Sequence, residues 1–343
     1  MFESFLQSYL IFLAKSVTVV VVLLAVVTIL IGAVRQLNSL RPPEHLEVRN
    51  LNDRFRDMAD SLSEMLLPDA ELKKLHKRRK IDAKSRHKGT APERPSVYVL
   101  NFKGDLHAHA VEELREEISA VLQVAKPGDT VLLRLESEGG LVHAYGLAAS
   151  QLARIRSRGI ELVAAIDKVA ASGGYLMACV ASRVIAAPFA VVGSIGVVGQ
   201  LPNFSRLLRR LDVDYELHTA GEFKRTLTLF GENTEAARAK FREELEDTHR
   251  LFKQFVGEHR PQLELDKVAT GEHWFGTRAK DLKLVDELQT SDDYLLERAD
   301  HAELIEIRFH RRKPLSERLS HGLVGLGTGI RHGLQDNLRT RWR

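Results

Sequence analysis

The chain has 343 residues, of which 44% are hydrophobic and 28% are charged. This composition is ordinary for a globular protein and excludes global disorder, and the length allows one large core with accessory segments. A single cysteine, Cys179, excludes an internal disulfide framework and a multi-cysteine metal site. Because Cys179 lies in an apolar helical run, we expect an inert core residue.

The net charge of +4 conceals two basic segments. Residues 73–88 contain nine Lys and Arg against the single acid Asp82, and residues 308–343 contain nine against two acids. Basic segments attract nucleic acid or anionic lipid. Neither segment has the interleaved aromatic residues of a nucleic-acid-binding module. We therefore expect no nucleic-acid partner and an association with membrane lipid.

The first element along the chain is an apolar run. Residues 16–34 contain no charged side chain, and a helix needs about 20 apolar residues to cross a bilayer. A cleaved signal peptide would have a shorter core followed by small residues, whereas Arg35 follows this run at once. We predict an uncleaved membrane anchor, a transmembrane helix, over 1–35. A cleaved signal peptide and a buried helix are the alternatives.

The arginines after the anchor bear on its orientation. Arg35, Arg41 and Arg49 follow the apolar run closely, and the positive-inside rule would place the downstream chain in the cytoplasm. The rule is weaker where a long folded domain is translocated. The sequence pattern by itself leaves both orientations open.

Apolar residues at spacings of three and four continue over 44–67. They form a heptad seam, which predicts an amphipathic helix. Two interpretations remain, a helix that lies on the domain or the membrane and a helix that mediates oligomerisation. Residues 68–95 are charged and then rich in Pro, Ser and Thr, which predicts a basic linker. The seam consists of Val48, Leu51, Phe55, Met58, Leu62 and Met65.

An alternation of strands and helices begins near residue 96. Segments 97–102 and 130–136 read as short strands, and an apolar stripe over 111–125 predicts a helix between them. Such alternation implies an α/β core with a largely parallel sheet. We place this domain at 96–300 and a basic, glycine-containing tail at 301–343. Further helices are predicted over 144–159, 174–182 and around 241–255, and strands over 160–167, 183–188 and 213–219.

Four short elements contain residues able to do chemistry. Ser172 is expected between a strand and a helix, where unpaired N–H groups and the helix dipole favour a developing negative charge. Gly173 lets the chain turn tightly, and the Gly139-Gly140 pair could supply a second N–H to an oxyanion hole. The elements are SEGG (137–140), ASGGY (171–175), GSIGV (193–197) and GEFK (221–224).

A nucleophilic serine needs a base. Lys224 is a candidate if burial keeps it neutral, since desolvation lowers the pKa of a lysine, and Ser-Lys is a recognised pairing. Four histidines are also candidates. The pair His107 and His109 has no further ligand pattern nearby, so we expect no metal. No Walker motif is present, so we expect no ATP dependence and no cofactor. The four histidines are His107, His109, His143 and His218.

Taken together and in this order, the elements resemble the signal peptide peptidase A family of membrane-bound serine peptidases. The resemblance runs from about residue 96 to 290 and includes DKVAASGGY, RVIAAP, GEFKR and WFGTRAKDLKLVDEL. It implies a crotonase/Clp-protease-like superhelix of ββα units. It also implies a serine endopeptidase that forms an acyl-enzyme and acts on hydrophobic peptides or signal-peptide remnants, outside the cytoplasm at the bacterial inner membrane.

The resemblance also assigns roles to single residues. Ser172 matches the family nucleophile, Lys224 its general base, and Ser194 the serine that hydrogen-bonds and orients that lysine. Single-domain members form homo-oligomeric rings in which neighbouring subunits contribute the serine and the lysine, and we expect such a ring here. The oxyanion-hole region corresponds to Gly139, Gly140 and Gly173.

Two positions depart from the family pattern. Glu138 stands where the family often has proline, beside the oxyanion strand, and Lys283 stands where glycine is common, at a turn. Two other functions also remain open. One is a non-proteolytic membrane scaffold, and the other is an acyl-CoA enzyme of the crotonase type, against which the anchor, Ser172 and Lys224 argue.

Overall fold

The computed structural model describes residues 12–26, 28, 44–75, 77, 94–221 and 223–311. Within it, Leu46–Phe309 form one compact unit. Most of the predicted linker, the predicted tail beyond 311 and Glu222 of the GEFK element lie outside the described residues.

The predicted anchor is described only in part. Residues 12–26 are helical, whereas residues 27 and 29–34 of the apolar run lie outside the described residues. Among the helices that the structure does describe, none combines the length and the apolar character needed to span a bilayer.

A seven-stranded sheet with the order β1-β10-β2-β3-β4-β6-β9 forms the centre of the compact unit. Every neighbouring pair from β10 to β9 is parallel, and parallel strands need crossover connections, which helices usually supply. The prediction of an α/β core with a largely parallel sheet is therefore confirmed. The strands are β1 (His45–Asn50), β2 (Ser96–Lys103), β3 (Thr130–Glu136), β4 (Glu161–Ile166), β6 (Arg183–Ala186), β9 (Glu287–Leu288) and β10 (Glu303–His310).

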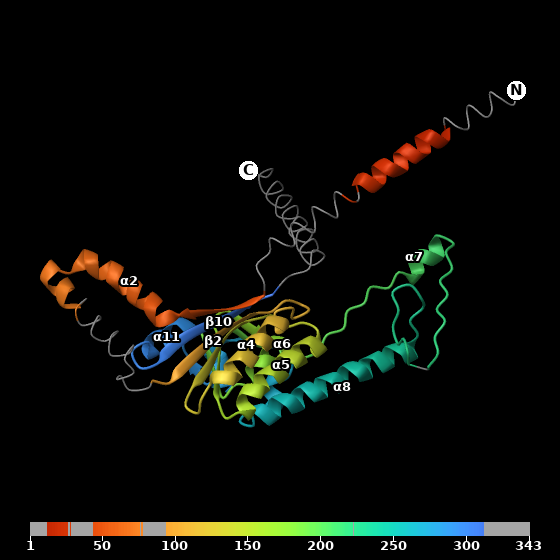
Figure 1. Ribbon diagram of the computed structural model, residues 1–343. Coiled ribbons are helices and arrows are strands. Elements are labelled where there is room, and N and C mark those ends of the chain that lie inside the picture. The colour runs from red at the N-terminus through yellow and green to blue at the C-terminus, as the bar shows by residue number, and fades with distance from the viewer. Residues whose placement is uncertain are drawn as a thin grey trace, which may run out of the picture. The chain divides into compact units, whose positions relative to one another are not determined.

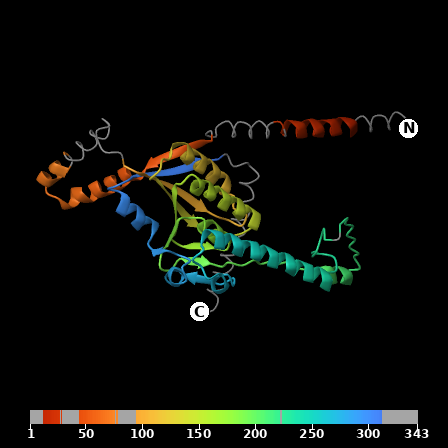
Figure 2. The ribbon, with the colours of Figure 1, turned by 90° about the horizontal axis from the view of Figure 1, so that it is seen from below.

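Helices cover both faces of this sheet (Figure 1, Figure 2). Successive residues of β2 point to opposite faces of the sheet. Leu100 therefore joins the buried cluster on one face, here called the first cluster, and Val99 joins the buried cluster on the other face, the second cluster. Burial on both faces explains why the strands read as continuous apolar runs. The helices are α4 (Val111–Val124) and α5 (Val142–Ser157) on the first face, and α2 (Leu51–Leu66) and α11 (Ser291–Arg298) on the second.

A second, three-stranded sheet of order β5-β7-β8 follows the same chain path. β4 lies in the large sheet, β5 in the small one, and the helix α6 comes next; β6 and β7 repeat this distribution. The chain thus runs through the strand-strand-helix units that the resemblance implied. The remaining elements are β5 (Val169–Ala171), α6 (Gly173–Ala178), β7 (Val191–Gly193), α9 (Leu265–Val268), β8 (His273–Phe275) and α10 (Gly276–Asp281).

The domain extends past the predicted boundary at residue 300. β10, which we assigned to the tail over 301–343, pairs with β2 in parallel, with Glu303 opposite Ser96. Its Leu304 and Ile307 are buried in the core. The difference arises because the place of β10 in the sheet depends on its pairing with the distant strand β2, which no local pattern of residues reveals.

The predicted helix over 44–67 begins later than expected. Residues 45–50 form β1 at the sheet edge, so Val48 of the seam lies in a strand. Asn50 caps α2, because its side chain accepts a hydrogen bond from the Asp53 N–H at 3.1 Å. Leu51 and Phe55 pack on the second cluster, whereas the remaining seam residues, Met58, Leu62 and Met65, are exposed.

Residues 213–219 do not form the predicted strand. They belong to an excursion over 197–234, here called the arm, which contains one short helix, α7 (Ser205–Arg210). The side chains of 213–219 are exposed, and no described strand lies beside them to pair with. A β-rich pattern forms a strand only where a neighbouring strand is present.

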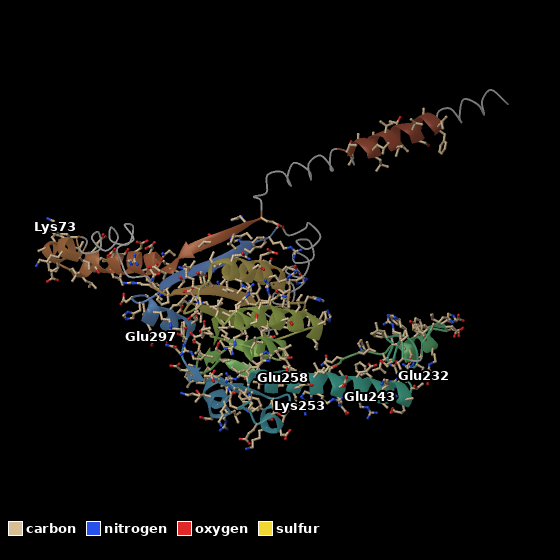
Figure 3. The ribbon with its side chains drawn as sticks, turned by 60° about the horizontal axis from the view of Figure 1, so that its bottom comes forward. Lys73, Glu232, Glu243, Lys253, Glu258 and Glu297 are labelled. Carbon is tan, nitrogen blue, oxygen red and sulfur yellow. The ribbon has the colours of Figure 1, made fainter. Side chains whose placement is uncertain are left out.

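The long helix α8 (Glu235–His259) joins the arm to the sheet. Figure 3 shows Glu243 toward the arm and Glu258 beside the sheet. Phe241 lies against Gly199 of the arm, so that a methyl group on Gly199 would strike the phenylalanine ring. Val256 at the other end is fully buried in the first cluster.

Candidate active site

Two parallel strands of the small sheet end side by side at Ser172 and Ser194. The register pairs Ala171 with Gly193, so the two following serines are neighbours across strands spaced about 4.8 Å apart. The Ser172 N–H donates to the Gly193 carbonyl at 2.8 Å. The fold thus brings together two predicted site residues that lie in different motifs.

Both serines have a left-handed backbone, with φ of 52° at Ser172 and 53° at Ser194. Such a conformation in a residue other than glycine costs about 1–3 kcal/mol and persists only where the surroundings fix it. At Ser172 the carbonyl accepts the Leu176 N–H at 3.0 Å, and at Ser194 the N–H donates to the Glu272 carbonyl at 2.6 Å. Strain of this kind gathers at functional sites.

The Ser137–Gly140 loop lies directly against the Ser172 turn. Its first residue forms a parallel bridge with Ala170 of β5. A methyl group on Gly139 would lie 2.7 Å from the Gly173 nitrogen, and φ at Gly139 is 92°. Only glycine combines this backbone angle with so close an approach. The loop and the turn are therefore packed together as the prediction of a shared oxyanion site requires.

The glycines differ in what their N–H groups can do. The Gly139 N–H donates to Ser137 Oγ at 3.0 Å and is already engaged. The N–H groups of Gly140 and Gly173 have no acceptor within the described parts of the chain, and both residues line the cavity beside Ser172. Gly140 and Gly173 thus have N–H groups free to donate to a bound oxygen atom, whereas the Gly139 N–H holds the loop together.

Tyr145, a residue that the sequence analysis did not single out, supports this loop from α5. Its hydroxyl donates to the Asp105 carbonyl at 2.8 Å and lies 2.6 Å from Ser137 Oγ. Its ring fills the space in which a side chain at position 173 would lie. Burial raises the pKa of Tyr145, so the hydroxyl remains a donor. In the sequence Tyr145 reads only as one apolar position of a helix.

Replacing Tyr145 with phenylalanine is expected to lower the free energy of unfolding by about 1–3 kcal/mol, because Ser137 Oγ and the Asp105 carbonyl lose this partner. We also expect kcat to fall more than KM rises, since the loop carries Gly140. Urea unfolding and peptide cleavage measure both effects. Tyr98→Phe is the matched control, since Tyr98 lies on β2 in the same core cluster and its hydroxyl makes no described hydrogen bond. Equal effects of the two changes would contradict the supporting role.

An apolar cavity of about 190 Å³ opens beside Ser172. α6 contributes Leu176 to its wall, and α5 contributes Val142 and Gly146. One face of α8 closes the other side. A large apolar side chain of a bound peptide could enter this space. The α8 residues that line the cavity are Thr248, Leu251, Phe252 and Phe255.

The structure does not bring Lys224 to Ser172 of the same chain. Lys224 lies on the arm and is exposed, and the ring of its neighbour Phe223 is 5.0 Å from Lys240 Nζ. Lys240 precedes the cavity residue Thr248 by eight positions on α8, which is about 12 Å along a helix. Within the described residues, no lysine lines the cavity. Figure 1 shows the arm at the end of α8 that leaves the sheet.

The predicted histidine bases are also absent from the cavity lining. His109 Nδ1, for example, lies 2.6 Å from an Asp105 carboxyl oxygen. A different histidine reaches the strand end, because His249 Nε2 of α8 is 3.2 Å from the Ile195 carbonyl. Sequence reasoning missed His249, and it is the alternative base to test. The predicted candidates were His107, His109, His143 and His218.

The two departures from the family pattern occupy distinct places. Glu138 is part of the Ser137–Gly140 loop and lines a polar cavity of about 310 Å³ together with Gly139. Lys283 has φ of 62° and forms the predicted turn without glycine. Among the described residues, no group of three or more His, Cys, Asp and Glu is placed to hold a metal ion.

Comparison with known proteins identifies the family. The sequence model of the family described as "Peptidase family S49" matches residues 154–305, and the sequence model described as "Peptidase family S49 N-terminal" matches residues 4–152. A "Probable protease SohB" of Haemophilus influenzae is 49% identical over 326 residues, covering 92% of each chain. The chain belongs to peptidase family S49.

A second S49 relative, a "Probable protease SohB" of Buchnera aphidicola, is 54% identical over 242 residues, 71% of this chain and 70% of that one. This S49 chain is a serine peptidase, and the resemblance seen in the sequence is confirmed. Among solved structures, a mutant of a "1510-N membrane-bound stomatin-specific protease" with a substrate peptide superposes with a TM-score of 0.43 at 12% identity, over 68% of this chain and 99% of that chain.

Proposed function

We propose that this S49 peptidase is a membrane-anchored, ATP-independent endopeptidase that cleaves hydrophobic peptides, including signal-peptide remnants, with a Ser172–Lys224 dyad. One observation carries the proposal. The strained Ser172 turn stands beside the free N–H groups of Gly140 and Gly173 at an apolar cavity. Nucleophile, oxyanion donors and substrate space therefore occur in one place.

The proposed reaction follows acyl transfer. Ser172 Oγ attacks the peptide carbonyl while Lys224 Nζ accepts the hydroxyl proton, and Lys224 then returns it to the leaving amine. The N–H groups of Gly140 and Gly173 stabilise the tetrahedral oxyanion, where one such donor is worth about 10²–10³-fold in rate. Water activated by Lys224 then hydrolyses the acyl-enzyme. Ser194 would accept or donate a hydrogen bond that orients the lysine.

The position of Lys224 on the arm leads us to propose that the dyad forms between neighbouring copies in a ring. Repeated head-to-tail contacts that close generate rings. Exposed apolar side chains gather on the arm, and such surfaces mark interfaces between proteins. A neighbouring subunit that covers them would deliver its own cavity to Lys224. The exposed apolar residues of the arm include Val198, Leu201, Phe204, Leu207, Leu211, Phe223 and Phe230.

We place the enzyme in the inner membrane of a bacterial cell, with the peptidase domain on the periplasmic side. The charge-free apolar run over 16–34 supports an anchor. The basic segments 73–88 and 308–343 support contact with anionic lipid head groups. Membership in a peptidase family favours catalysis over the scaffold interpretation.

Labelling with a serine-directed fluorophosphonate probe tests this proposal. We expect the full-length wild-type chain to be labelled and Ser172→Ala to lose the label, because only a nucleophile activated by a base reacts. His249→Ala is expected to keep it. The matched control is Ser150→Ala, an exposed serine on α5. Labelling that persists in Ser172→Ala would exclude Ser172 as the nucleophile.

The same labelling in intact cells tests the orientation. A charged probe that cannot cross the inner membrane should label Ser172 in spheroplasts before lysis. Labelling that appears only after lysis would place the domain in the cytoplasm, in line with Arg35, Arg41 and Arg49.

A further inference from the structure

Four glycines line the apolar cavity beside Ser172. Three of them have no room for a side chain, because a methyl group there would meet neighbouring atoms at distances that real contacts do not reach. Packing therefore explains these three without reference to the cavity. They are Gly140 against the Leu106 backbone, Gly173 against the Tyr145 ring and Gly196 against Gly271.

Packing does not explain the fourth glycine, Gly146. A methyl group at this position would meet no atom within 4 Å, and its φ is not positive. Gly146 also lies inside α5 (Val142–Ser157), where glycine destabilises the helix relative to alanine. Neither packing nor backbone conformation calls for glycine here.

The empty space at Gly146 belongs to the cavity. Val142 lies one helical turn earlier and also lines the cavity, and side chains four positions apart project from the same face of a helix. A side chain at position 146 would therefore enter the cavity next to Val142. The cavity measures about 190 Å³, and an apolar cavity of about 150 Å³ suffices for a benzene molecule.

We propose that Gly146 is a specificity-determining residue, which keeps the cavity deep enough for a large apolar side chain, leucine or phenylalanine, next to the scissile bond. The inference rests on the proposed function, which supplies the peptide and the attack by Ser172. Leu176 and Phe252 provide the apolar walls for that side chain. The substrate class is thus peptides with a large aliphatic or aromatic residue at the cleavage site.

The test uses the full-length chain in detergent micelles and fluorogenic peptides that differ only in Ala, Val, Leu or Phe at one position. For the wild type, kcat/KM should rise with the size of this side chain. In Gly146→Leu, the ratio of kcat/KM for the Leu peptide to that for the Ala peptide should fall by about 10–200-fold, since the added side chain occupies the cavity. Gly146→Ala should lower this ratio less, in the same direction.

Ser150→Leu is the matched control, because Ser150 is exposed one turn further along α5 and does not line the cavity. It places the same leucine side chain on the same helix, outside the cavity, and should leave the ratio unchanged. Thermal unfolding of Gly146→Ala should occur at a higher temperature than that of the wild type, as expected of alanine in a helix. This measurement shows that the variant folds.

The outcomes separate this inference from the proposed function. If Gly146→Leu slows all four peptides by one factor, or if the wild type prefers the Ala peptide, the inference is overturned and the peptidase proposal stands. If the wild type cleaves no peptide and the fluorophosphonate probe does not label Ser172, both are overturned. A ratio that falls in Gly146→Leu and not in Ser150→Leu supports the inference.

Discussion

An equal mixture of Ser172→Ala and Lys224→Ala subunits, assembled together, is expected to recover roughly a quarter of wild-type activity, although each variant alone loses about 10³-fold or more. The reason is geometric. Lys224 lies on the arm, away from the cavity that contains Ser172 of its own chain. When the two subunit types alternate at random, about one site in four combines an intact serine with an intact neighbouring lysine.

The measurement is cleavage of an apolar fluorogenic peptide after co-expression of the two variants with different affinity tags. Co-expression matters because preformed rings need not exchange subunits. Lys253→Ala is the matched control, since Lys253 lies on α8 in the same chain (Figure 3) and does not line the cavity. It should retain activity within about twofold. A mixed assembly that stays inactive would place both dyad residues in one subunit, through movement of the arm.

Replacing Arg260 with alanine is expected to lower the free energy of unfolding by about 2–4 kcal/mol. Arg260 is only 2% exposed, and its guanidinium donates to both carboxyl oxygens of Asp286 at 2.7 and 2.8 Å. Burial is the largest single influence and lowers the pKa of this guanidinium, but the hydrogen bond to Asp286 and the neighbouring charges together raise the pKa above its ordinary value. Truncation would leave the Asp286 carboxylate without its charged partner. The loss is below the largest values for buried pairs because the Asp286 side chain is 33% exposed.

This ion pair also bears on the active site. Asp286 accepts the Val184 N–H at 2.7 Å, and the nearby Leu284 carbonyl accepts the Tyr175 hydroxyl at 3.0 Å. Tyr175 belongs to α6, which begins directly after Ser172. Loss of Arg260 should therefore lower activity as well as stability.

Urea unfolding measures the change, with Arg250→Ala as the matched control. Arg250 lies on α8, whereas Arg260 directly follows that helix. Arg250 pairs with Asp247, and its side chain is 71% exposed. An exposed ion pair of this kind contributes about 0–1 kcal/mol. The double variant Arg260→Met with Asp286→Leu should recover part of the lost stability, since neither charge then remains buried. Equal losses from Arg260→Ala and Arg250→Ala would contradict the role of burial.

Local sequence patterns predicted the strands and helices that pack against other strands and helices of the core. The strand over 130–136 and the helix over 111–125 were predicted almost to the residue, since an apolar period reports directly on burial. The strand predicted over 213–219 did not form, because no partner strand lies beside it. β10 was missed for the opposite reason, since its place in the sheet depends on pairing with β2.

The sequence by itself determined the α/β class, the turn at Ser172 and the family, because these follow from short motifs and from periodicity. Only the tertiary structure decided that Ser194 stands next to Ser172, that Gly140 rather than Gly139 has a free N–H, and that Lys224 lies on the arm. It also revealed that Tyr145 supports the Ser137–Gly140 loop and that Gly146 lines the cavity. Strand register, hydrogen-bond partners and empty space are relations between distant segments, and no local pattern of residues encodes them.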